Sequence, residues 1–241
     1  MEQGTPVIAV DGLSKSFGNH YALRNVNFTV KEGEFLTIFG PNGAGKTTLI
    51  RILSNITKAS TGQITIGGFL LDREPEKIRR RIGVIAHQTF LYEDLTAEEN
   101  LRFYAKLYDV NDLDHRIETL LTEVGLAHRR TDRVRTFSRG MQQRLSIARA
   151  MLHDPTLLLL DEPYTGLDQH AAAMLSGWLK RLRDSHRTTL MVTHDLEQGV
   201  DLADRVAILV KGRLVYDHQK SEIDLKNFRP LYNDLVDRGK Q

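Results

Sequence analysis

One short segment carries the residue types that bind phosphate: residues 40–47 read Gly-Pro-Asn-Gly-Ala-Gly-Lys-Thr. An apolar run, Phe35 to Phe39, precedes it and an amphipathic run starts at Thr48, so we expect a strand, a loop and a helix. Glycines let successive N–H groups point at phosphate oxygens, and the helix adds the positive end of its dipole. The alternative is a glycine-rich turn that matches by chance, and the flanking strand and helix argue against it.

This loop therefore predicts a nucleoside triphosphate site. The lysine can reach the β- and γ-phosphates, and the threonine hydroxyl can bind Mg²⁺. Lys46 is accordingly a candidate catalytic residue and Thr47 a candidate metal ligand. The candidate nucleotide-binding residues here are Gly40, Pro41, Asn42, Gly43, Ala44, Gly45, Lys46, Thr47 and Thr48.

Two adjacent carboxylates follow another apolar run, Leu157 to Leu160. A buried strand that ends in Asp161 and Glu162 would deliver both groups to the edge where α/β sheets place their ligands. Asp161 would hold Mg²⁺, directly or through a water, and Glu162 would act as the base that polarises the attacking water. Alone, such a pair could equally cap a strand-to-turn junction; together with the phosphate loop it predicts catalysis.

Two further polar residues follow strand-like runs in the same way. His194 comes after the run Leu190 to Val192 and could donate a hydrogen bond to the γ-phosphate. Gln88 comes after the run Ile82 to Ala86 and could touch Mg²⁺ or position water. The chain has 9 histidines, and a single histidine or glutamine is as often structural, so the residue types alone leave both roles open.

Composition limits the classes of function. The chain has 241 residues, enough for a substantial core, and its 33 basic and 31 acidic side chains nearly balance. The sequence has no basic arm of the kind that would indicate binding to nucleic acid. The absence of cysteine excludes disulfides and thiolate metal sites. We expect no signal peptide at residues 1–6 and no membrane span, so any membrane role needs another polypeptide. The basic stretch Lys77 to Arg81 favours a solvated helix face over a membrane or partner patch.

The order of periodic segments predicts one compact α/β unit. Short alternating segments, Val7 to Val10 and Asn25 to Val30, indicate a β-rich start, and residues 89–152 show helical spacing. After Pro155 strands and helices alternate, which is typical of a parallel sheet. The tail after Asp217 is polar. The expected helices are Glu98–Tyr108, Arg116–Val124, Gln142–Met151, Ala171–Arg183 and Leu196–Ala203, and the expected later strands are Leu157–Leu160, Leu190–Val192 and Val206–Val210.

The order of these motifs resembles the nucleotide-binding subunits of ATP-binding-cassette (ABC) transporters over nearly the whole chain. Residues 137–144 resemble the family's signature motif and residues 165–168 its D-loop. His194 corresponds to the switch histidine and Gln88 to the Q-loop glutamine. Phe17 lies where the family places an aromatic ring against adenine, although an ordinary core aromatic is the alternative.

The resemblance implies a P-loop NTPase fold of the α/β class. Its RecA-like core has a mainly parallel sheet, with an N-terminal antiparallel β-subdomain and an inserted α-helical subdomain. We expect a single nucleotide-binding domain over residues 1–241. Its parts would be residues 7–88 (β-subdomain and phosphate loop), 89–152 (helical signature subdomain), 153–217 (remaining core) and 218–241 (polar tail).

The signature motif differs from the common sequence Leu-Ser-Gly-Gly-Gln. Phe137, Arg139 and Met141 replace the usual residues, whereas Ser138 and Gly140 remain. These two would supply a hydroxyl and a close backbone N–H at a helix N-terminus, so anion binding should survive. The effect of the arginine on geometry and nucleotide affinity stays open.

By resemblance, two such domains form a head-to-tail homodimer or heterodimer. Each ATP would lie between one subunit's phosphate loop and the other's Ser138 and Gly140, and Asp168 would couple the two sites. Separate transmembrane permease subunits would contact residues 88–104, which places the chain at the cytoplasmic face of the membrane as a Mg²⁺-dependent ATPase. No nucleic-acid partner is implied.

The wording of several segments resembles small export-type cassettes. Residues 82–88, 95–104 and 161–168 are similar to the ATPase subunit of the haem exporter of cytochrome c maturation. The alternatives are the ATPase of another exporter, for drugs, lipids or polysaccharides, and a soluble ABC ATPase that acts as an assembly factor. The motifs give neither cargo nor direction of transport.

Overall fold

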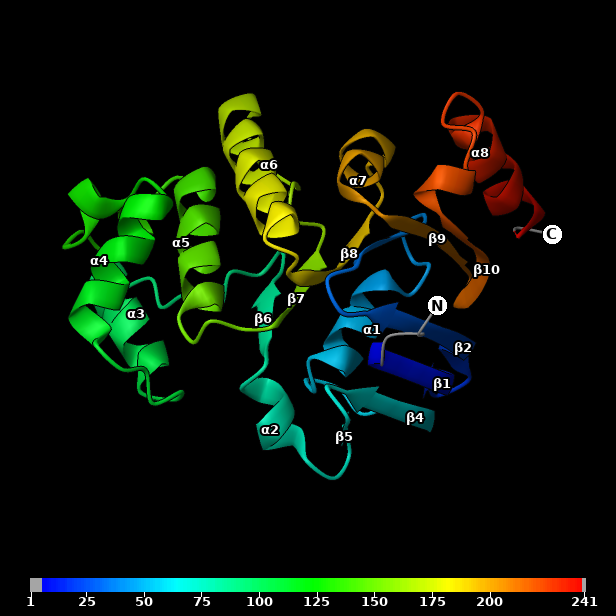
Figure 1. Ribbon diagram of the computed structural model, residues 1–241, viewed down its shortest axis with the longest axis horizontal. Coiled ribbons are helices and arrows are strands. Elements are labelled where there is room, and N and C mark those ends of the chain that lie inside the picture. Colours follow the sequence, from blue (N-terminus) through cyan, green and yellow to red (C-terminus); the bar gives the residue numbers. More distant parts are fainter. Residues whose placement is uncertain (1–5, 240–241) are drawn as a thin grey trace.

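Two β-sheets and eight α-helices make up the described part of the chain in the computed structural model, which describes residues 6–239 except the side chain of His170 (Figure 1). The first sheet, sheet A, has the strand order β2-β1-β4-β5 and is antiparallel. Its strands are β1 (Pro6–Phe17), β2 (His20–Lys31), β4 (Thr61–Ile66) and β5 (Phe69–Leu70).

The second sheet, sheet B, has the strand order β10-β9-β3-β8-β7-β6. All its pairs are parallel except β10 with β9. Its strands are β3 (Phe35–Phe39), β6 (Ile82–Ile85), β7 (Leu157–Asp161), β8 (Thr188–Thr193), β9 (Arg205–Val210) and β10 (Arg213–Gln219). The predicted α/β class, with an antiparallel N-terminal sheet and a mainly parallel core sheet, is confirmed.

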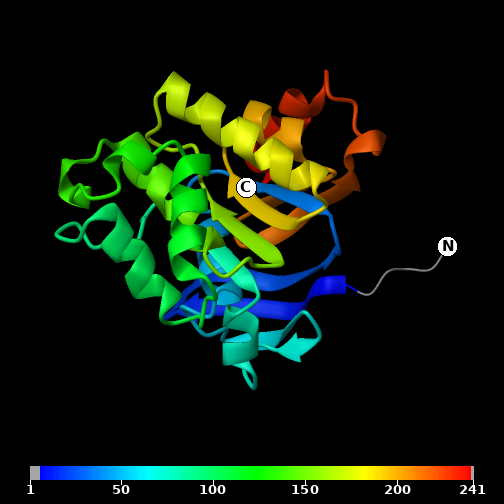
Figure 2. The same cartoon turned by 60° about the vertical axis from the view of Figure 1, so that its left-hand side comes forward.

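Burial on both faces explains why the strands of sheet B are continuous apolar runs. All five residues of β3, all five of β7 and all six of β8 are buried. Alternate residues point to opposite faces, and each face has its own core. On one face Leu36, Ile38 and Leu159 pack with α1 and sheet A; on the other, Phe35, Leu158 and Leu160 pack with the helices of residues 97–179. Figure 2 shows this layering.

The helices begin where side chains can cap them. Ser138, Asp168 and Asp195 are the N-caps of α5, α6 and α7, and each accepts backbone N–H bonds from the first turn of its helix. The helices are α1 (Lys46–Leu53), α2 (Pro75–Arg79), α3 (Ala97–Ala105), α4 (Leu113–Glu123), α5 (Arg139–Met151), α6 (Gln169–Asp184), α7 (Leu196–Leu202) and α8 (Phe228–Arg238).

The structure corrects two details of the sequence patterns. The basic stretch Lys77 to Arg81 is helical only in part, because α2 ends at Arg79, three residues before β6 begins. The polar tail contains α8, whose Phe228 and Val236 are buried against β9 and against Phe39 at the end of β3. Residues 1–5, which include most of the segment expected to lack a signal peptide, lie outside the described residues. No helix within residues 6–239 is both long and apolar enough to cross a membrane.

The α8 contact supports the strand that leads into the phosphate loop. Phe228 is 3% exposed, and its ring packs edge-on against Phe39 with centroids 5.6 Å apart. We expect Phe228→Ala to lower the free energy of unfolding by about 3 kcal/mol and the Tm by roughly 6–12 °C, because it leaves a cavity. Leu225→Ala, at a 51% exposed position, is the control and should change stability by less than about 0.5 kcal/mol. Equal melting temperatures for the two variants would contradict this packing role.

Candidate functional site

The phosphate loop lies between β3 and α1, wedged against two other strands. Gly45 has a φ of 106°, in the left-handed region, and a Cβ there would lie 2.3 Å from the carbonyl oxygen of Ala22. A Cβ on Gly40 would lie 2.4 Å from the carbonyl oxygen of Leu209. Only glycine fits at these two positions, so the loop is held close to β2 and β9 with its backbone N–H groups at the start of a helix.

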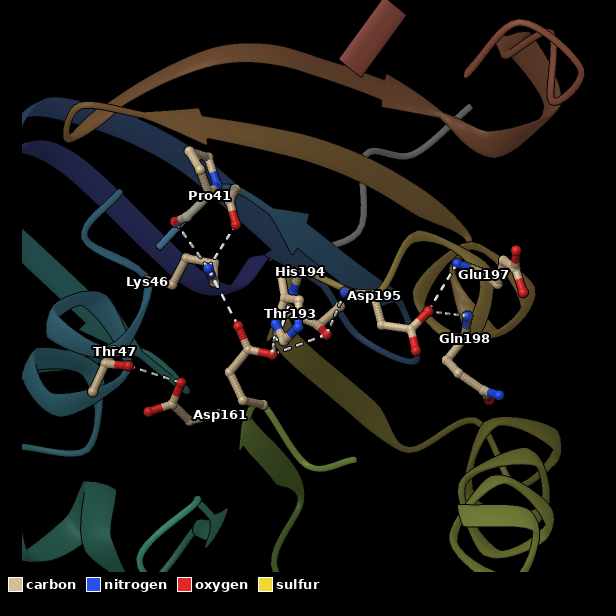
Figure 3. Close-up of polar contacts among 11 residues, drawn as sticks. Pro41, Lys46, Thr47, Asp161, Thr193, His194, Asp195, Glu197 and Gln198 are labelled. Carbon is tan, nitrogen blue, oxygen red and sulfur yellow. Dashed lines mark hydrogen bonds and ion pairs between the residues drawn. The ribbon is translucent and has the colours of Figure 1, made fainter. Parts of the chain in front are cut away.

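Lys46 is folded into the loop, with its side chain 6% exposed. Its ammonium donates hydrogen bonds to the carbonyl oxygens of Gly40, at 2.6 Å, and Pro41, at 3.1 Å (Figure 3). It also forms an ion pair with Glu162, whose Oε1 lies 3.2 Å away. The loop lysine and the predicted base are therefore in direct contact, although their segments are far apart in the sequence.

The two predicted metal ligands Thr47 and Asp161 also meet. The hydroxyl of Thr47 donates to Oδ1 of Asp161 at 3.1 Å (Figure 3). Burial raises the pKa of Asp161; the Thr47 hydrogen bond opposes that shift, and the nearby charge of Glu162 adds to it. A buried carboxylate beside a hydroxyl is a donor set that suits Mg²⁺, which binds through one or two carboxylates together with phosphate oxygens and waters. Residues 6–239 contain no cluster of three or more His, Cys, Asp or Glu side chains that could hold a metal ion.

Glu162 is held in place by groups from two segments, the phosphate loop and the end of β8. Its φ of 50° lies in the left-handed region, which is unusual for a residue other than glycine. The Oε2 atom accepts hydrogen bonds from the hydroxyl of Thr193, at 3.2 Å, and from the backbone N–H of His194, at 3.3 Å. Because a carboxylate can only accept, the ring Nδ1 of His194, 2.8 Å from the same oxygen, carries the proton. His194 itself is 56% exposed.

The turn after β8 fixes the position of this histidine. Asp195 caps α7 by accepting from the backbone N–H groups of Glu197, at 3.0 Å, and Gln198, at 3.1 Å (Figure 3). The hydroxyl of Thr193 accepts from the N–H of Asp195 as well as donating to the glutamate. Sequence reasoning did not select Thr193, although a hydroxyl residue directly before the histidine at a strand end was the available signal.

Two cavities flank the loop and contain most of the predicted residues. The first has a volume of about 510 Å³, and its lining includes Thr47, Asp161, Glu162, His194 and Gln88. Gln88 is exposed and makes no hydrogen bond with any residue in the part of the chain that the structure describes. The structure thus brings the glutamine to the same cavity as the two metal-ligand candidates, with its side chain free to bind.

The second cavity, of about 400 Å³, places Phe17 beside the phosphate loop. Residues 42–48 line this cavity together with the aromatic ring. Phe17 is 56% exposed, so it is not a core aromatic of the β-rich region, and the ammonium of Lys15 lies 4.8 Å from its ring centroid. An exposed ring next to a phosphate loop is the geometry required for stacking on a base.

The signature residues Ser138 and Gly140 and the D-loop residue Asp168 lie outside both cavities, whereas Thr165, the first residue of the D-loop, lines the first cavity. Ser138 is exposed at the start of α5, where its hydroxyl accepts from the N–H of Met141 at 3.3 Å, and Asp168 is exposed at the start of α6. Gly140 packs against α6, where an added Cβ would lie 3.1 Å from that of Ala171. A single chain therefore does not bring Ser138, Gly140 and Asp168 to its own phosphate loop.

Arg139, the unusual residue of the signature, is turned toward the Q-loop of its own chain. Its guanidinium donates to the ring Nδ1 of His87 at 3.1 Å and to the carbonyl oxygen of the same residue. His87 directly precedes Gln88, so the substituted signature position contacts the segment that carries the glutamine.

A family model described as ABC transporter matches residues 23–165, which include the phosphate loop, the signature and both carboxylates. The chain belongs to the ABC transporter family. It is 40% identical to the uncharacterized ABC transporter ATP-binding protein YdbJ of Bacillus subtilis, over 92% of this chain and 70% of the relative. The Nod factor export ATP-binding protein I of Rhizobium johnstonii is 36% identical over 86% of this chain and 68% of its own length.

Other members of the ABC family show that the direction of transport varies among relatives. The sulfate/thiosulfate import ATP-binding protein CysA of Mycobacterium tuberculosis is 38% identical, over 87% of this chain and 60% of the relative. Among solved structures, the dimeric post-hydrolysis state of the ATP-binding cassette MJ0796 with ADP and Pi superposes with a TM-score of 0.81 at 30% identity, covering 88% of this chain and 98% of that one. This ABC chain is an ATP-binding subunit with the P-loop NTPase fold; no named relative identifies the haem-exporter subtype.

The buried Asp161 gives a pH-dependent prediction. Its folded-state pKa lies above the unfolded value near 3.8, so its ionisation disfavours the folded state at neutral pH and has no effect well below that value. We expect Asp161→Asn to raise the Tm at pH 7.5 and this gain to shrink to nothing as the pH falls below about 4. The asparagine oxygen can still accept from Thr47.

Thermal unfolding over this pH range measures the effect. Asp11→Asn, at an exposed position of β1, is the matched control and should give no gain at any pH. Asp161→Asn, unlike this control, should also lose the extra stabilisation that Mg²⁺ adds when ATP is bound. A Tm gain that persists unchanged at low pH would show that burial of the charge is not its cause.

Proposed function

We propose that the chain hydrolyses ATP with Mg²⁺ and drives export through separate membrane permease subunits. The main observation behind this proposal is the position of Glu162 directly after β7. One of its carboxylate oxygens contacts Lys46, and the other contacts Thr193 and His194. This places a carboxylate base, a cation for phosphate and a histidine donor around one point. Membership of the ABC family supports the same activity.

The contacts suggest how each side chain acts. Phosphate oxygens would replace the carbonyl oxygens that now surround the ammonium of Lys46, which would free Oε1 of Glu162. Oε1 would take a proton from the attacking water while the oxygen of that water forms a bond to the γ-phosphorus. At the same time the bond between the γ-phosphorus and the β–γ bridging oxygen breaks, giving ADP and phosphate. Thr47, Asp161 and Gln88 would hold Mg²⁺, which neutralises developing phosphate charge. As an imidazolium, His194 would keep its Nδ1–H bond to Glu162 and donate its Nε2–H to the γ-phosphate.

The signature supports a dimer in which each subunit completes the other's site. Ser138 is exposed at the N-terminus of a thirteen-residue helix and lines neither cavity of its own chain. Such a helix end, with a close glycine N–H, is suited to an anion. The dimeric MJ0796 cassette with ADP and Pi is a precedent for this assembly. We therefore propose that ATP lies between two copies, or between this chain and a second cassette.

An exposed aromatic surface supports docking of a permease beside the Q-loop. Tyr92 is 48% exposed and Phe103 is 41% exposed, with their ring centroids 4.9 Å apart, and Leu107 is 62% exposed. Large apolar side chains gathered next to a functional loop are typical of an interface. This surface falls within and next to the segment 88–104, and docking there would hold the chain at the cytoplasmic face of the membrane.

The sequence of the signature motif and the Nod factor export relative both favour export. Import, as in the sulfate/thiosulfate relative, is the alternative direction. For cargo, the resemblance of residues 82–88, 95–104 and 161–168 to the haem exporter ATPase of cytochrome c maturation supports haem as the first substrate to test. The other candidate cargoes are drugs, lipids and polysaccharides.

The role of Glu162 can be tested by an isosteric change. Glu162→Gln keeps the size of the side chain but cannot accept the proton, so we expect kcat to fall by about 100-fold or more while ATP affinity stays within about threefold. The ATP-bound dimer should accumulate, as seen by size-exclusion chromatography with ATP. Glu222→Gln, at a 60% exposed position paired with His218, is the control. Undiminished hydrolysis by Glu162→Gln would eliminate the proposed base.

The permease can be identified from the host membrane. We expect the tagged chain to co-purify with integral membrane proteins after detergent solubilisation, identified by mass spectrometry. Replacing Phe103 and Leu107 with serine should reduce this recovery about tenfold without lowering ATP hydrolysis by the isolated chain. Recovery of small multi-span proteins of the cytochrome maturation type would support haem export, and an unrelated permease would replace that cargo. A chain found wholly in the soluble fraction would instead favour an assembly factor.

A further inference from the structure

The position of Gln88 depends on its neighbours, because its side chain forms no hydrogen bond with the described residues. On one side of it, the carbonyl oxygen of His87 accepts from Arg139. On the other side, the carbonyl oxygen of Phe90 accepts from the hydroxyl of Tyr104. The glutamine therefore lies on a short segment that is fastened at both ends to helices α5 and α3.

Arg149 of α5 contacts both arms of this segment. Its Nη2 donates to the carbonyl oxygen of Val84 in β6 at 2.7 Å, before the glutamine. The same guanidinium lies 5.5 Å from the ring centroid of Phe90, after the glutamine, and 5.1 Å from that of Tyr104. Distances of this size are within the range of cation–π attraction. A single side chain thus links the strand that enters the loop to the residue that leaves it.

Arg149 holds its charge in an apolar setting. Its Nε is buried and has no hydrogen-bond partner, and no carboxylate pairs with the side chain among residues 6–239. Burial lowers the pKa of Arg149, as expected for a cation held mainly by carbonyl and aromatic groups. Buried charge of this kind disfavours folding unless its contacts compensate. A purely structural position would be filled at less cost by an apolar residue.

Phe90 shows that the segment is held in an unusual shape. Its φ of 54° is in the left-handed region, which a bulky residue adopts only when its surroundings impose it. The surroundings of this residue include the guanidinium of Arg149, beside its ring, and the hydroxyl of Tyr104, which donates to its carbonyl oxygen. Without the ring contact, the backbone at residue 90 would relax, and the residue two positions earlier would move with it.

We propose that Arg149 is a positioning residue that, through the ring of Phe90, sets Gln88 against the Mg²⁺ ligands Thr47 and Asp161. The proposal rests on the proposed ATP hydrolysis and assigns to α5 a role in the site of its own chain. Gln88, Thr47 and Asp161 line one cavity, and Phe90 and Val84 line the same cavity. A shift of the glutamine would therefore weaken Mg²⁺ binding without removing a ligand.

Substitutions at Phe90 test the ring contact without burying an unpaired group. We expect Phe90→Leu to raise the Mg²⁺ concentration for half-maximal ATP hydrolysis by about five- to tenfold, with ATP affinity unchanged. Phe90→Tyr keeps the aromatic face and should remain within about twofold of the wild type. The matched control is Phe69→Leu in sheet A, which removes a ring 5.0 Å from another arginine, Arg81, and should leave the Mg²⁺ requirement unchanged.

A double-mutant cycle separates positioning from simple packing. If the ring acts through the glutamine, Phe90→Leu should shift the Mg²⁺ requirement no further in a Gln88→Ala background. An equal shift in both backgrounds, or a lowered Tm with an unchanged Mg²⁺ requirement, would overturn the proposal.

A second measurement does not depend on turnover. In Glu162→Gln protein, the part of the ATP-induced rise in Tm that requires Mg²⁺ should be reduced by Phe90→Leu and retained by Phe90→Tyr. An unreduced rise with Phe90→Leu counts against the positioning role even if hydrolysis is absent. If the wild type does not hydrolyse ATP but the Mg²⁺-dependent rise in Tm changes as expected, the proposed activity is wrong and the positioning role of Arg149 stands.

Discussion

The site depends on the parallel alignment of four neighbouring strands, β3, β8, β7 and β6. Because parallel strands end at the same edge of a sheet, one contribution from each meets the others there. β3 leads into the phosphate loop, β7 ends at Asp161 and Glu162, β8 leads to His194, and β6 leads to Gln88. The ion pair between Lys46 and Glu162 and the hydrogen bond from Thr47 to Asp161 are direct results of that alignment.

This arrangement carries costs that the rest of the fold compensates. Burial raises the pKa of Asp161, which is the cost of placing a carboxylate there, and Glu162 adopts a left-handed backbone conformation. Both residues follow a strand whose five residues are all buried, with cores on both faces. Burial of that much apolar surface is large enough to hold one unfavourable charge and one strained residue at its end. The groups proposed to bind phosphate and Mg²⁺ are therefore fixed in the protein alone.

Much of the site could be predicted because its residues stand at the ends of apolar runs. The runs before Gly40, Asp161 and His194 are continuous since their strands are buried on both faces, and such runs are visible in a single sequence. Long-range pairs were not visible in this way. Nothing in the spacing of Arg149 and Phe90 indicates that they meet, since the contact depends on how α5 lies beside β6.

The helix α8 was missed for a related reason. Its polar composition hides two buried residues, Phe228 and Val236, which pack with β9 and with Phe39 of β3. Phe17 was found by family resemblance, and its exposure, which favours base stacking over a core role, could be established only in three dimensions.

One rigid element, α5, carries both Ser138 at its start and Arg149 near its end, about 17 Å apart along the axis. In the proposed dimer, the first residue would face the nucleotide of the partner and the second would steady the Mg²⁺ ligands of its own subunit. A tilt of this helix caused by one nucleotide would then be felt at the other. The two ATP sites would be coupled through this one helix in each subunit, so that they hydrolyse ATP together rather than independently.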